Sequence, residues 1–283
     1  MQKRFQNELK SSRNPLSTLI MDKVGLNTEA TRTIQEIMGG NIFDYSKPIS
    51  LLKTLIPQVA NNRDIILDFF SGSSVTAHAV IDLNAQDNCN RKFIMVQLPE
   101  FCDEKSEAYK AAYKTIADIG KERIRRAGEK IIADNADKEG IENLDIGFKV
   151  FKLSSSNIKP WDADFNTLEN ALLSSVDNIK DGRSEDDVLY EILLKYGLDL
   201  TVPIEERQIG GKTVYAIGFG ALVICLDDAI TLDVVEGIGK LKAELEPEIM
   251  RVVFKDSGFA DDVVKTNAIQ ILKKHGIDDV KSL

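Results

Sequence analysis

Apolar positions are densest between residues 64 and 80, which read DIILDFFSGSSVTAHAV. Residues 65–70 form a nearly continuous apolar run, a pattern typical of a strand covered on both faces within a parallel sheet. Residues 71–74 (SGSS) then carry almost no side-chain bulk, and residues 76–80 continue in a helical pattern. The stretch predicts a buried strand, a small-residue loop and a helix, with free backbone N–H groups facing a ligand above the carboxyl end of the strand.

Further elements are predicted around this unit. A short helix over residues 28–38 has Thr28 as a plausible N-cap and Gly39 and Gly40 as its stop. The other predicted elements of this half are an amphipathic helix at 50–56, a second buried strand at 92–98, a long amphipathic helix at 107–131 and an alternating strand at 147–153 that completes the first sheet. Residues 154–162 (SSSNIKPWD) mark a domain exit.

The second half has a different pattern, typical of an α+β domain. Gly210 and Gly211 between two strand patterns are a strong hairpin signal. The other predicted elements are helices at 187–196 and 231–245, strands at 220–226 and 251–254, and a last helix that begins near Asp261 and Asp262 and ends at Gly276. No catalytic cluster is visible here, and His275 is expected at a helix end.

The strand, loop and helix at residues 64–80 have the geometry of a nucleotide or nucleoside site. Glycine stands at only one of the three fingerprint positions, held here by Gly72, Ser74 and Ala77, so a nicotinamide-dependent oxidoreductase is poorly supported. No Gly-Lys-Ser/Thr ending is present, which excludes a Walker A loop. Gln97 ends the second strand, where related folds often place an acid for the ribose hydroxyls. An ordinary strand-to-helix turn remains the alternative.

Composition limits the possible functions. The 283 residues suit one large or two modest domains. The formal net charge of -9 argues against a chain that binds DNA by itself, because lysine and arginine contacts with phosphates supply most nonspecific affinity. The three cysteines lack metal-site spacing, so reduced thiols in the cytoplasm are expected, and no apolar run is long enough to span a membrane. The basic stretch at residues 1–15 is either a phosphate-contacting arm or a frayed terminus. Lys121, Arg123, Arg125 and Arg126 are consistent with a nucleic-acid contact, but we expect a solvated helix face with Glu122 paired to Arg126.

Several separated segments together resemble one known family. The segments, in chain order, are FDYSKPISLLKTLI, DFFSGSS with TAHAV, RKFIMVQLPE, YKTIADIGKERIRRA and the closing FKDSGFADDVVKTNAIQILKKHGI. They resemble the modification (Mod) subunit of type III restriction-modification systems. That family is a site-specific adenine-N6 DNA methyltransferase of the permuted class, in which the cofactor motif follows the catalytic motif. The resemblance runs over essentially the whole chain.

The resemblance implies a fold, a cofactor and partners. The fold would be α/β, a partial Rossmann-like S-adenosylmethionine-dependent methyltransferase sheet with a smaller α+β C-terminal domain. The division would be an N-terminal segment at 1–40, a cofactor-binding half at 41–155 and an assembly domain at 156–283. The residues implied in binding S-adenosylmethionine are Phe43, Lys47, Ser50, Asp68, Phe70, Ser71, Gly72, Ser73 and Gln97. Expected partners are a separate N-terminal catalytic half or a second Mod copy, the restriction (Res) subunit, and DNA only within the intact enzyme.

Two departures from the family pattern matter. The usual Gly-Ser-Gly-Thr-Thr loop is replaced by Gly-Ser-Ser-Val-Thr at residues 72–76, which adds bulk near the ligand. The seven prolines are never adjacent, so the Asp-Pro-Pro-Tyr motif that holds the flipped adenine is absent from this sequence. We therefore expect a truncated Mod that lacks catalytic residues and metal ligands and is inactive by itself. The strand at 64–70 would then have an open edge, which we expect a separate N-terminal half, a second copy or the first forty residues of the chain to cover. The alternative is a noncatalytic assembly module.

Overall fold

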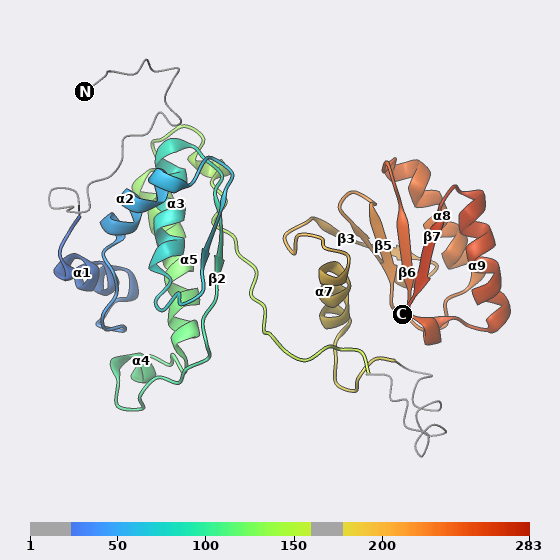
Figure 1. Ribbon diagram of the computed structural model, residues 1–283, viewed down its shortest axis with the longest axis horizontal. Helices are drawn as coiled ribbons and strands as arrows, with labels where there is room; N and C mark the ends of the chain where they lie inside the picture. Colours follow the sequence, from blue (N-terminus) through green and yellow to red (C-terminus); the bar gives the residue numbers. More distant parts are fainter. Residues whose placement is uncertain (1–23, 160–177) are drawn as a thin grey trace, which may run out of the picture. The chain divides into compact units, whose positions relative to one another are not determined.

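The computed structural model describes residues 24–159 and 178–283, which divide into two compact units, Met1–Phe148 and Lys149–Leu283 (Figure 1). The basic stretch at 1–15 lies outside the described residues, as does part of the predicted domain exit. Both units combine helices with a β-sheet, so the predicted α/β class is confirmed at this level. No helix in the described ranges is long and apolar enough to cross a bilayer.

The first unit is built on a pair of parallel strands. β1 (Ile65–Asp68) pairs with β2 (Lys92–Met95), and α3 (Val75–Asp87) connects them. The other elements of this unit are α1 (Asn27–Met38), α2 (Ile49–Val59), α4 (Glu107–Lys110), α5 (Ile116–Asp134) and the short η2 (Ile141–Asn143). α3 packs against both α2 and α5, and α1 packs against α5. The apolar interior of this unit therefore lies among the helices and on one face of the strands.

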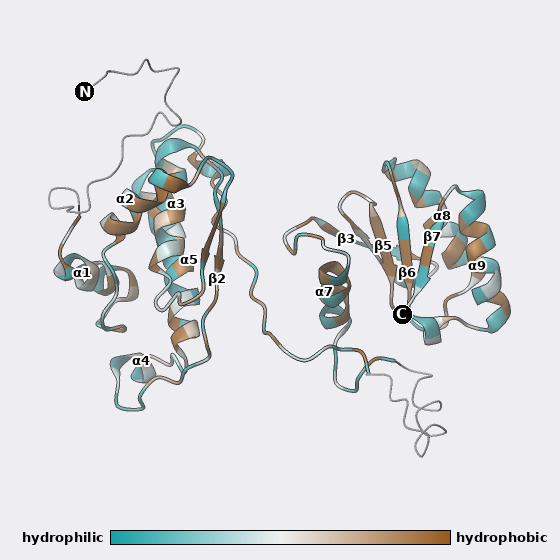
Figure 2. Ribbon diagram, viewed as in Figure 1, coloured by the Kyte–Doolittle hydropathy of each residue, from teal (hydrophilic) through white to brown (hydrophobic). Residues whose placement is uncertain are grey.

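The two strands are covered on one face only, so the prediction of burial on both faces is wrong. Ile66 and Phe93 pack against the helical layer, whereas Ile65 is 56%, Leu67 58% and Ile94 50% exposed. Figure 2 shows how apolar these strands are. A continuous apolar run indicates that both faces suit burial, but no second layer within the described ranges covers the outer face. No third strand pairs with β1 or β2 there either.

Three local predictions in this unit need correction. The helix expected at 107–131 is interrupted, because Ala112 takes a left-handed φ of 69° and α5 starts anew after Thr115. Thr115 and Asp118 form a capping box, a sequence signal for a helix start that outweighs the apolar periodicity around it. Residues 147–153 form no strand. Leu26, not Thr28, is the N-cap of α1, although Gly39 ends that helix as expected.

The second unit is a five-stranded mixed sheet with helices on both faces. The strand order is β3 (Ile204–Ile209), β4 (Lys212–Ile217), β5 (Leu222–Cys225), β6 (Arg251–Phe254) and β7 (Asp279–Ser282). β3, β4 and β5 are antiparallel, and β5, β6 and β7 are parallel. α7 (Glu185–Lys195) covers one face, and α8 (Leu232–Leu245) and α9 (Asp262–Lys274) cover the other. A short 3₁₀ turn, η3 (Asp256–Gly258), follows β6.

Most elements of the second unit agree with their predictions. Gly210 and Gly211 have φ values of 58° and 76° and form the two-residue turn between β3 and β4. Asp261 caps α9 by accepting a hydrogen bond from the backbone N–H of Val264. His275 lies at the C-terminal end of α9, with its Nε2 3.0 Å from a carboxylate oxygen of Glu236. β7 was not predicted, because its sequence DVKS is short and mostly polar.

Candidate functional site

The loop after β1 is held tightly at the carboxyl end of the two strands. The backbone N–H of Ser71 donates to the carbonyl of Val96 at 3.1 Å, and that of Ser74 donates to the carbonyl of Ser71 at 2.7 Å. Gly72 and Ser74 take left-handed φ values of 50° and 58°. Gly72 adopts this conformation at little cost, but Ser74 carries strain, which is common where a loop is shaped for a ligand. The loop then runs directly into α3.

Two side chains stabilise this loop through hydrogen bonds: Asp68, at the end of β1, and Gln97, two residues after the end of β2. The Asp68 carboxylate accepts a hydrogen bond from the Thr76 hydroxyl at 2.5 Å and another from the Phe70 N–H at 3.1 Å. The Oε1 atom of Gln97 accepts the Gly72 N–H at 2.8 Å. The N–H groups of Ser71, Gly72 and Ser74 are therefore paired. Within the described ranges, those of Ser73, Val75 and Thr76 have no acceptor, so free N–H groups occur at the end of the loop and the start of α3.

The segment before α2 reaches the same loop. The ring of Phe43 lies beside Gly72, and a Cβ atom placed on Gly72 would be 3.5 Å from the Cζ atom of Phe43. The hydroxyl groups of Ser46 and Ser73 are 3.1 Å apart. Lys47 follows with an exposed side chain. Residues separated by more than twenty positions along the chain thus meet around Gly72.

Ser50 occupies a different place from the other predicted residues. Its hydroxyl donates to the carboxylate of Glu29 at 2.7 Å, and its backbone N–H donates to the same carboxylate at 3.2 Å. It also accepts the backbone N–H of Gly25. Ser50 therefore connects α1 to the start of α2 and does not contact the loop. The structure gathers seven of the other predicted residues at or beside the loop: Phe43, Asp68, Phe70, Ser71, Gly72, Ser73 and Gln97. Lys47 is exposed and follows Ser46, whose hydroxyl contacts that of Ser73.

Arg123 also belongs to this site, so the prediction that it lies on a solvated helix face is wrong. It is fully buried, and its Nη1 atom donates to the hydroxyls of Ser73 at 2.7 Å and Ser46 at 3.0 Å. Burial lowers the pKa of this guanidinium to about 10. The signal was present in the sequence, because position 123 is four residues from both Ile119 and Ala127 and so lies on the apolar stripe of α5.

His78, in the first turns of α3, is buried behind the loop. It is 7% exposed, and its Nδ1 atom has no hydrogen-bond partner within the described part of the chain. Burial, together with the nearby positive charge of Arg123, lowers the pKa of this imidazole to about 3. His78 is therefore neutral at physiological pH.

Gly120 allows α5 to approach the loop closely. A Cβ atom at this position would lie 2.5 Å from the Ser74 hydroxyl oxygen and 3.3 Å from the Gly72 carbonyl oxygen. Any larger side chain would therefore displace the loop or the helix. Gly120, Ser46 and Thr76 join Arg123 as residues of this site that were not predicted.

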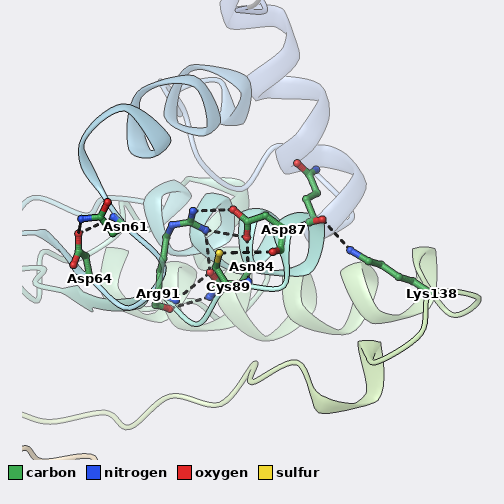
Figure 3. A network of polar contacts seen from close by, with 8 residues as sticks. Asn61, Asp64, Asn84, Asp87, Cys89, Arg91 and Lys138 are labelled. Atoms are coloured by element: carbon green, nitrogen blue, oxygen red, sulfur yellow. Dashed lines mark hydrogen bonds and ion pairs between the residues drawn. The ribbon is translucent and has the colours of Figure 1, made fainter. Parts of the chain in front are cut away.

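A second polar network lies at the opposite end of α3, where the helix turns into β2 (Figure 3). Arg91 binds the Asp87 carboxylate through both terminal nitrogens, at 2.7 and 3.1 Å, and Asn84 bonds the backbone of Arg91 in both directions. The Lys138 ammonium donates to the carbonyls of Ala85 and Gln86. These contacts hold the connection into β2 and so fix the register that places Gln97 beside Gly72.

Three of the four basic residues noted on α5 form ion pairs with carboxylates of the same helix. Glu122 pairs with Arg126 at 2.7 Å, as predicted, and with Arg125 at 3.0 Å, while Lys121 pairs with Asp118. This agrees with a solvated helix face, except for the buried Arg123. No group of three or more potential metal ligands occurs within residues 24–159 or 178–283. The described site brings together backbone N–H groups, hydroxyls, the Asp68 carboxylate and one buried cation.

Comparison with known proteins agrees with this geometry. Residues 3–125, which include the loop, α3, β2 and the start of α5, match the DNA methylase family. The chain is 38% identical over 144 residues to the Mod subunit of the type III restriction-modification enzyme StyLTI from Salmonella typhimurium, covering 51% of this chain and 22% of that protein. The resemblance to type III Mod subunits is confirmed.

Two further similarities extend this result. The Mod subunit of the type III enzyme EcoP15I from Escherichia coli is 37% identical over 169 residues, or 60% of this chain and 24% of that subunit. The type II methyltransferase M.KpnI from Klebsiella pneumoniae is 35% identical over 107 residues, or 38% of this chain and 26% of that enzyme. The Mod-like chain thus spans about a quarter of the length of these curated relatives.

Proposed function

We propose that the first unit is the S-adenosylmethionine-binding part of a site-specific, adenine-N6 DNA methyltransferase of a type III restriction-modification system. The observation that carries this proposal is the preformed loop around Gly72, at the carboxyl end of two parallel strands. In open α/β sheets, small ligands bind at this end of the strands. The match of this region to DNA methylases supports the same reaction class.

The residues around the loop fit the cofactor. Gly72 presents no side chain, and the unpaired N–H groups at the start of α3 suit an anionic or polar ligand. Phe43 and Phe70 provide apolar surface, and the exposed ammonium of Lys47 suits a carboxylate. Gln97 accepts the Gly72 N–H with its Oε1 atom and donates one amide hydrogen to the Leu98 carbonyl at 3.3 Å, which leaves its second amide hydrogen to donate to a ribose hydroxyl. S-adenosylmethionine would supply the electrophilic methyl group.

The catalytic residues would come from elsewhere, because the sequence has no adjacent prolines and hence no Asp-Pro-Pro-Tyr motif. The outer face of the β1–β2 pair supports a partner half in the same enzyme. Its exposed apolar side chains are Ile65, Leu67, Phe69, Ile94, Val96 and Leu98. Contiguous exposed apolar side chains mark interaction surfaces, and strands with unpaired edges accept further strands. A catalytic half, or a second copy of the chain, would cover this face and build a partial Rossmann-like sheet into a complete one.

For the second unit we propose an assembly role, in contact with a second Mod-like subunit or a restriction subunit. In residues 178–283 the titratable groups form caps and surface ion pairs, such as Asp261 at the start of α9 and Arg207 with Glu244. Two of the three relatives named above are Mod subunits, which supports this assignment. The second candidate function is a noncatalytic assembly module that uses both units only for association.

Titration calorimetry with S-adenosylmethionine separates these two functions. We expect the purified chain to bind with a dissociation constant in the micromolar range, about -8 kcal/mol. Gly72→Asp should abolish binding, because its carboxylate would fill the loop beside Phe43. The matched control is Gly140→Asp. Gly140 also has a positive φ, of 83°, but nothing lies within 4 Å of the position of its Cβ atom, so backbone strain alone is reproduced.

The outcomes are distinct. Binding by the wild type and by Gly140→Asp, but not by Gly72→Asp, would support the cofactor-binding function. Equal binding by all three proteins would place the cofactor outside the loop and refute the proposed site. No binding by the wild type would favour the assembly module.

A further inference from the structure

Arg123 is the one fully buried arginine of the described residues, and it joins three segments of the chain. It projects from α5, and its Nη1 atom donates both to Ser46, in the segment before α2, and to Ser73, in the loop after β1. The two hydroxyls also lie within hydrogen-bond distance of each other. The Nη1 atom and the two hydroxyl oxygens thus form a triangle of hydrogen bonds. Ser46 and Ser73 lie 77 and 50 positions from Arg123 in the sequence.

This arginine is unusual because no carboxylate compensates its charge. Within the described ranges it takes part in no ion pair, and its Nε and Nη2 atoms are buried without a partner. Removing a cation from water costs free energy, and two hydroxyl acceptors offset only part of that cost. An apolar side chain of similar length would fill the same space on the apolar stripe of α5. Stability of this unit alone therefore does not account for an arginine here.

The consequence of its contacts is geometric. Ser46 is three residues from Phe43, whose ring lies against Gly72, and Ser73 is the next residue after Gly72. By binding both hydroxyls, Arg123 keeps Phe43 next to the loop and holds the loop against α5. Without the guanidinium, the hydrogen bond between the two serines would be the one polar contact left, among the described residues, between the segment and the loop.

We propose that Arg123 is a positioning residue that clamps the segment at residues 43–48 onto the loop at residues 71–74, so that the ligand-binding surface around Gly72 is formed before a ligand arrives. A preformed site avoids the entropy cost of ordering two segments upon binding. This inference rests on the proposed function for its binding readout, but the clamp itself is measurable without any cofactor.

The test uses hydrogen exchange followed by mass spectrometry on the full chain without ligand. Arg123→Met keeps the length of the side chain and removes its donors. We expect exchange in peptides covering 43–48 and 71–76 to become about tenfold faster or more, the scale of a lost charge-assisted hydrogen bond. Exchange in the middle of α3 and α5 should not change, and the melting temperature should be equal or higher.

Two further variants control the experiment. Arg123→Lys restores a cation with donors and should recover part of the protection. Arg125→Met removes an exposed arginine of the same helix, which pairs with Glu122 and lies over the Phe148 ring, and should leave both peptides unchanged. S-adenosylmethionine affinity, measured in parallel, should fall about tenfold or more in Arg123→Met and stay unchanged in Arg125→Met.

The two proposals fail separately. Unchanged exchange in both peptides of Arg123→Met would overturn the clamp, whether or not the wild type binds cofactor. Faster exchange throughout the first unit would also overturn it, because that result indicates a general contribution to folding. If exchange in Arg123→Met is faster only in these two peptides while the wild type binds no S-adenosylmethionine, the clamp is supported and the proposed cofactor is refuted.

Discussion

The buried His78 makes the stability of the first unit depend on pH in a defined direction. Its folded-state pKa is lowered to about 3, mainly by burial and secondly by the charge of Arg123. In the unfolded chain its pKa returns to the ordinary histidine value of 6.5. Below that value the unfolded state binds a proton that the folded state does not, so stability falls as the pH decreases. Above it, both states carry a neutral imidazole and this contribution is constant.

The magnitude follows from the two pKa values. Between pH 7 and pH 5 the difference in proton binding destabilises the folded state by about 2 kcal/mol. The loss continues at about 1.4 kcal/mol per pH unit until the pH nears the folded-state value. Carboxylates titrate over the same range, but they are common to the wild type and its variants and cancel in the comparison. His78→Gln should therefore lose about 2 kcal/mol less than the wild type over this interval.

Hydrogen exchange of the α3 amides at pH 5 and pH 7, corrected for intrinsic exchange rates, measures this effect in the first unit alone. His275→Gln is the matched control, because it changes the only other histidine of the sequence and lies in the second unit. It should retain the full wild-type loss in α3. Equal losses in the wild type and in His78→Gln would show that His78 is not held neutral by burial, and would refute the reasoning.

Two further predictions concern close packing and the exposed sheet face. Gly120→Ala should lower the free energy of unfolding by about 1–3 kcal/mol because its Cβ atom clashes with Ser74, and the higher helix propensity of alanine should offset about 1 kcal/mol of this loss. The substitution should also weaken S-adenosylmethionine binding in calorimetry. Gly128→Ala, whose Cβ would meet only Ile146 at 2.9 Å, should change stability but not binding, and equal effects on binding would contradict this assignment. Leu67→Glu should change the stability of the chain by no more than about 0.5 kcal/mol, because Leu67 is 58% exposed. It should reduce concentration-dependent self-association in sedimentation velocity, and unchanged association would exclude this face as the interface.

Local chemistry explains which parts were predictable from the sequence. The turn at Gly210 and Gly211, the end of α1 at Gly39 and the loop around Gly72 each follow from residues that tolerate a left-handed backbone. The order of strand, loop and helix in the sequence predicts that Asp68 and Gln97 lie at the same end of the sheet. Sequence patterns thus located most of the candidate site, because its backbone frame is made of contiguous segments.

The remaining features depend on contacts between segments far apart in the sequence. The apolar stripe of α5 indicated that position 123 faces the interior, but an arginine is accommodated there because Ser46 and Ser73, 77 and 50 positions away, accept its hydrogen bonds. The sequence was equally consistent with a place for Ser50 beside the loop, whereas in the structure its hydroxyl donates to the Glu29 carboxylate. In each case a polar side chain had two possible environments, and the packing of helices decided between them.

The apolar run from Ile65 to Phe70 shows the division most clearly. The sequence by itself determined that this segment is a strand suited to burial on both faces, since apolar side chains stand at nearly every position. Tertiary structure decided that one face packs on α3 and its neighbouring helices while the other remains exposed. Side-chain composition sets the free-energy gain of burial, but only the arrangement of other elements in space determines whether a surface is present to provide it.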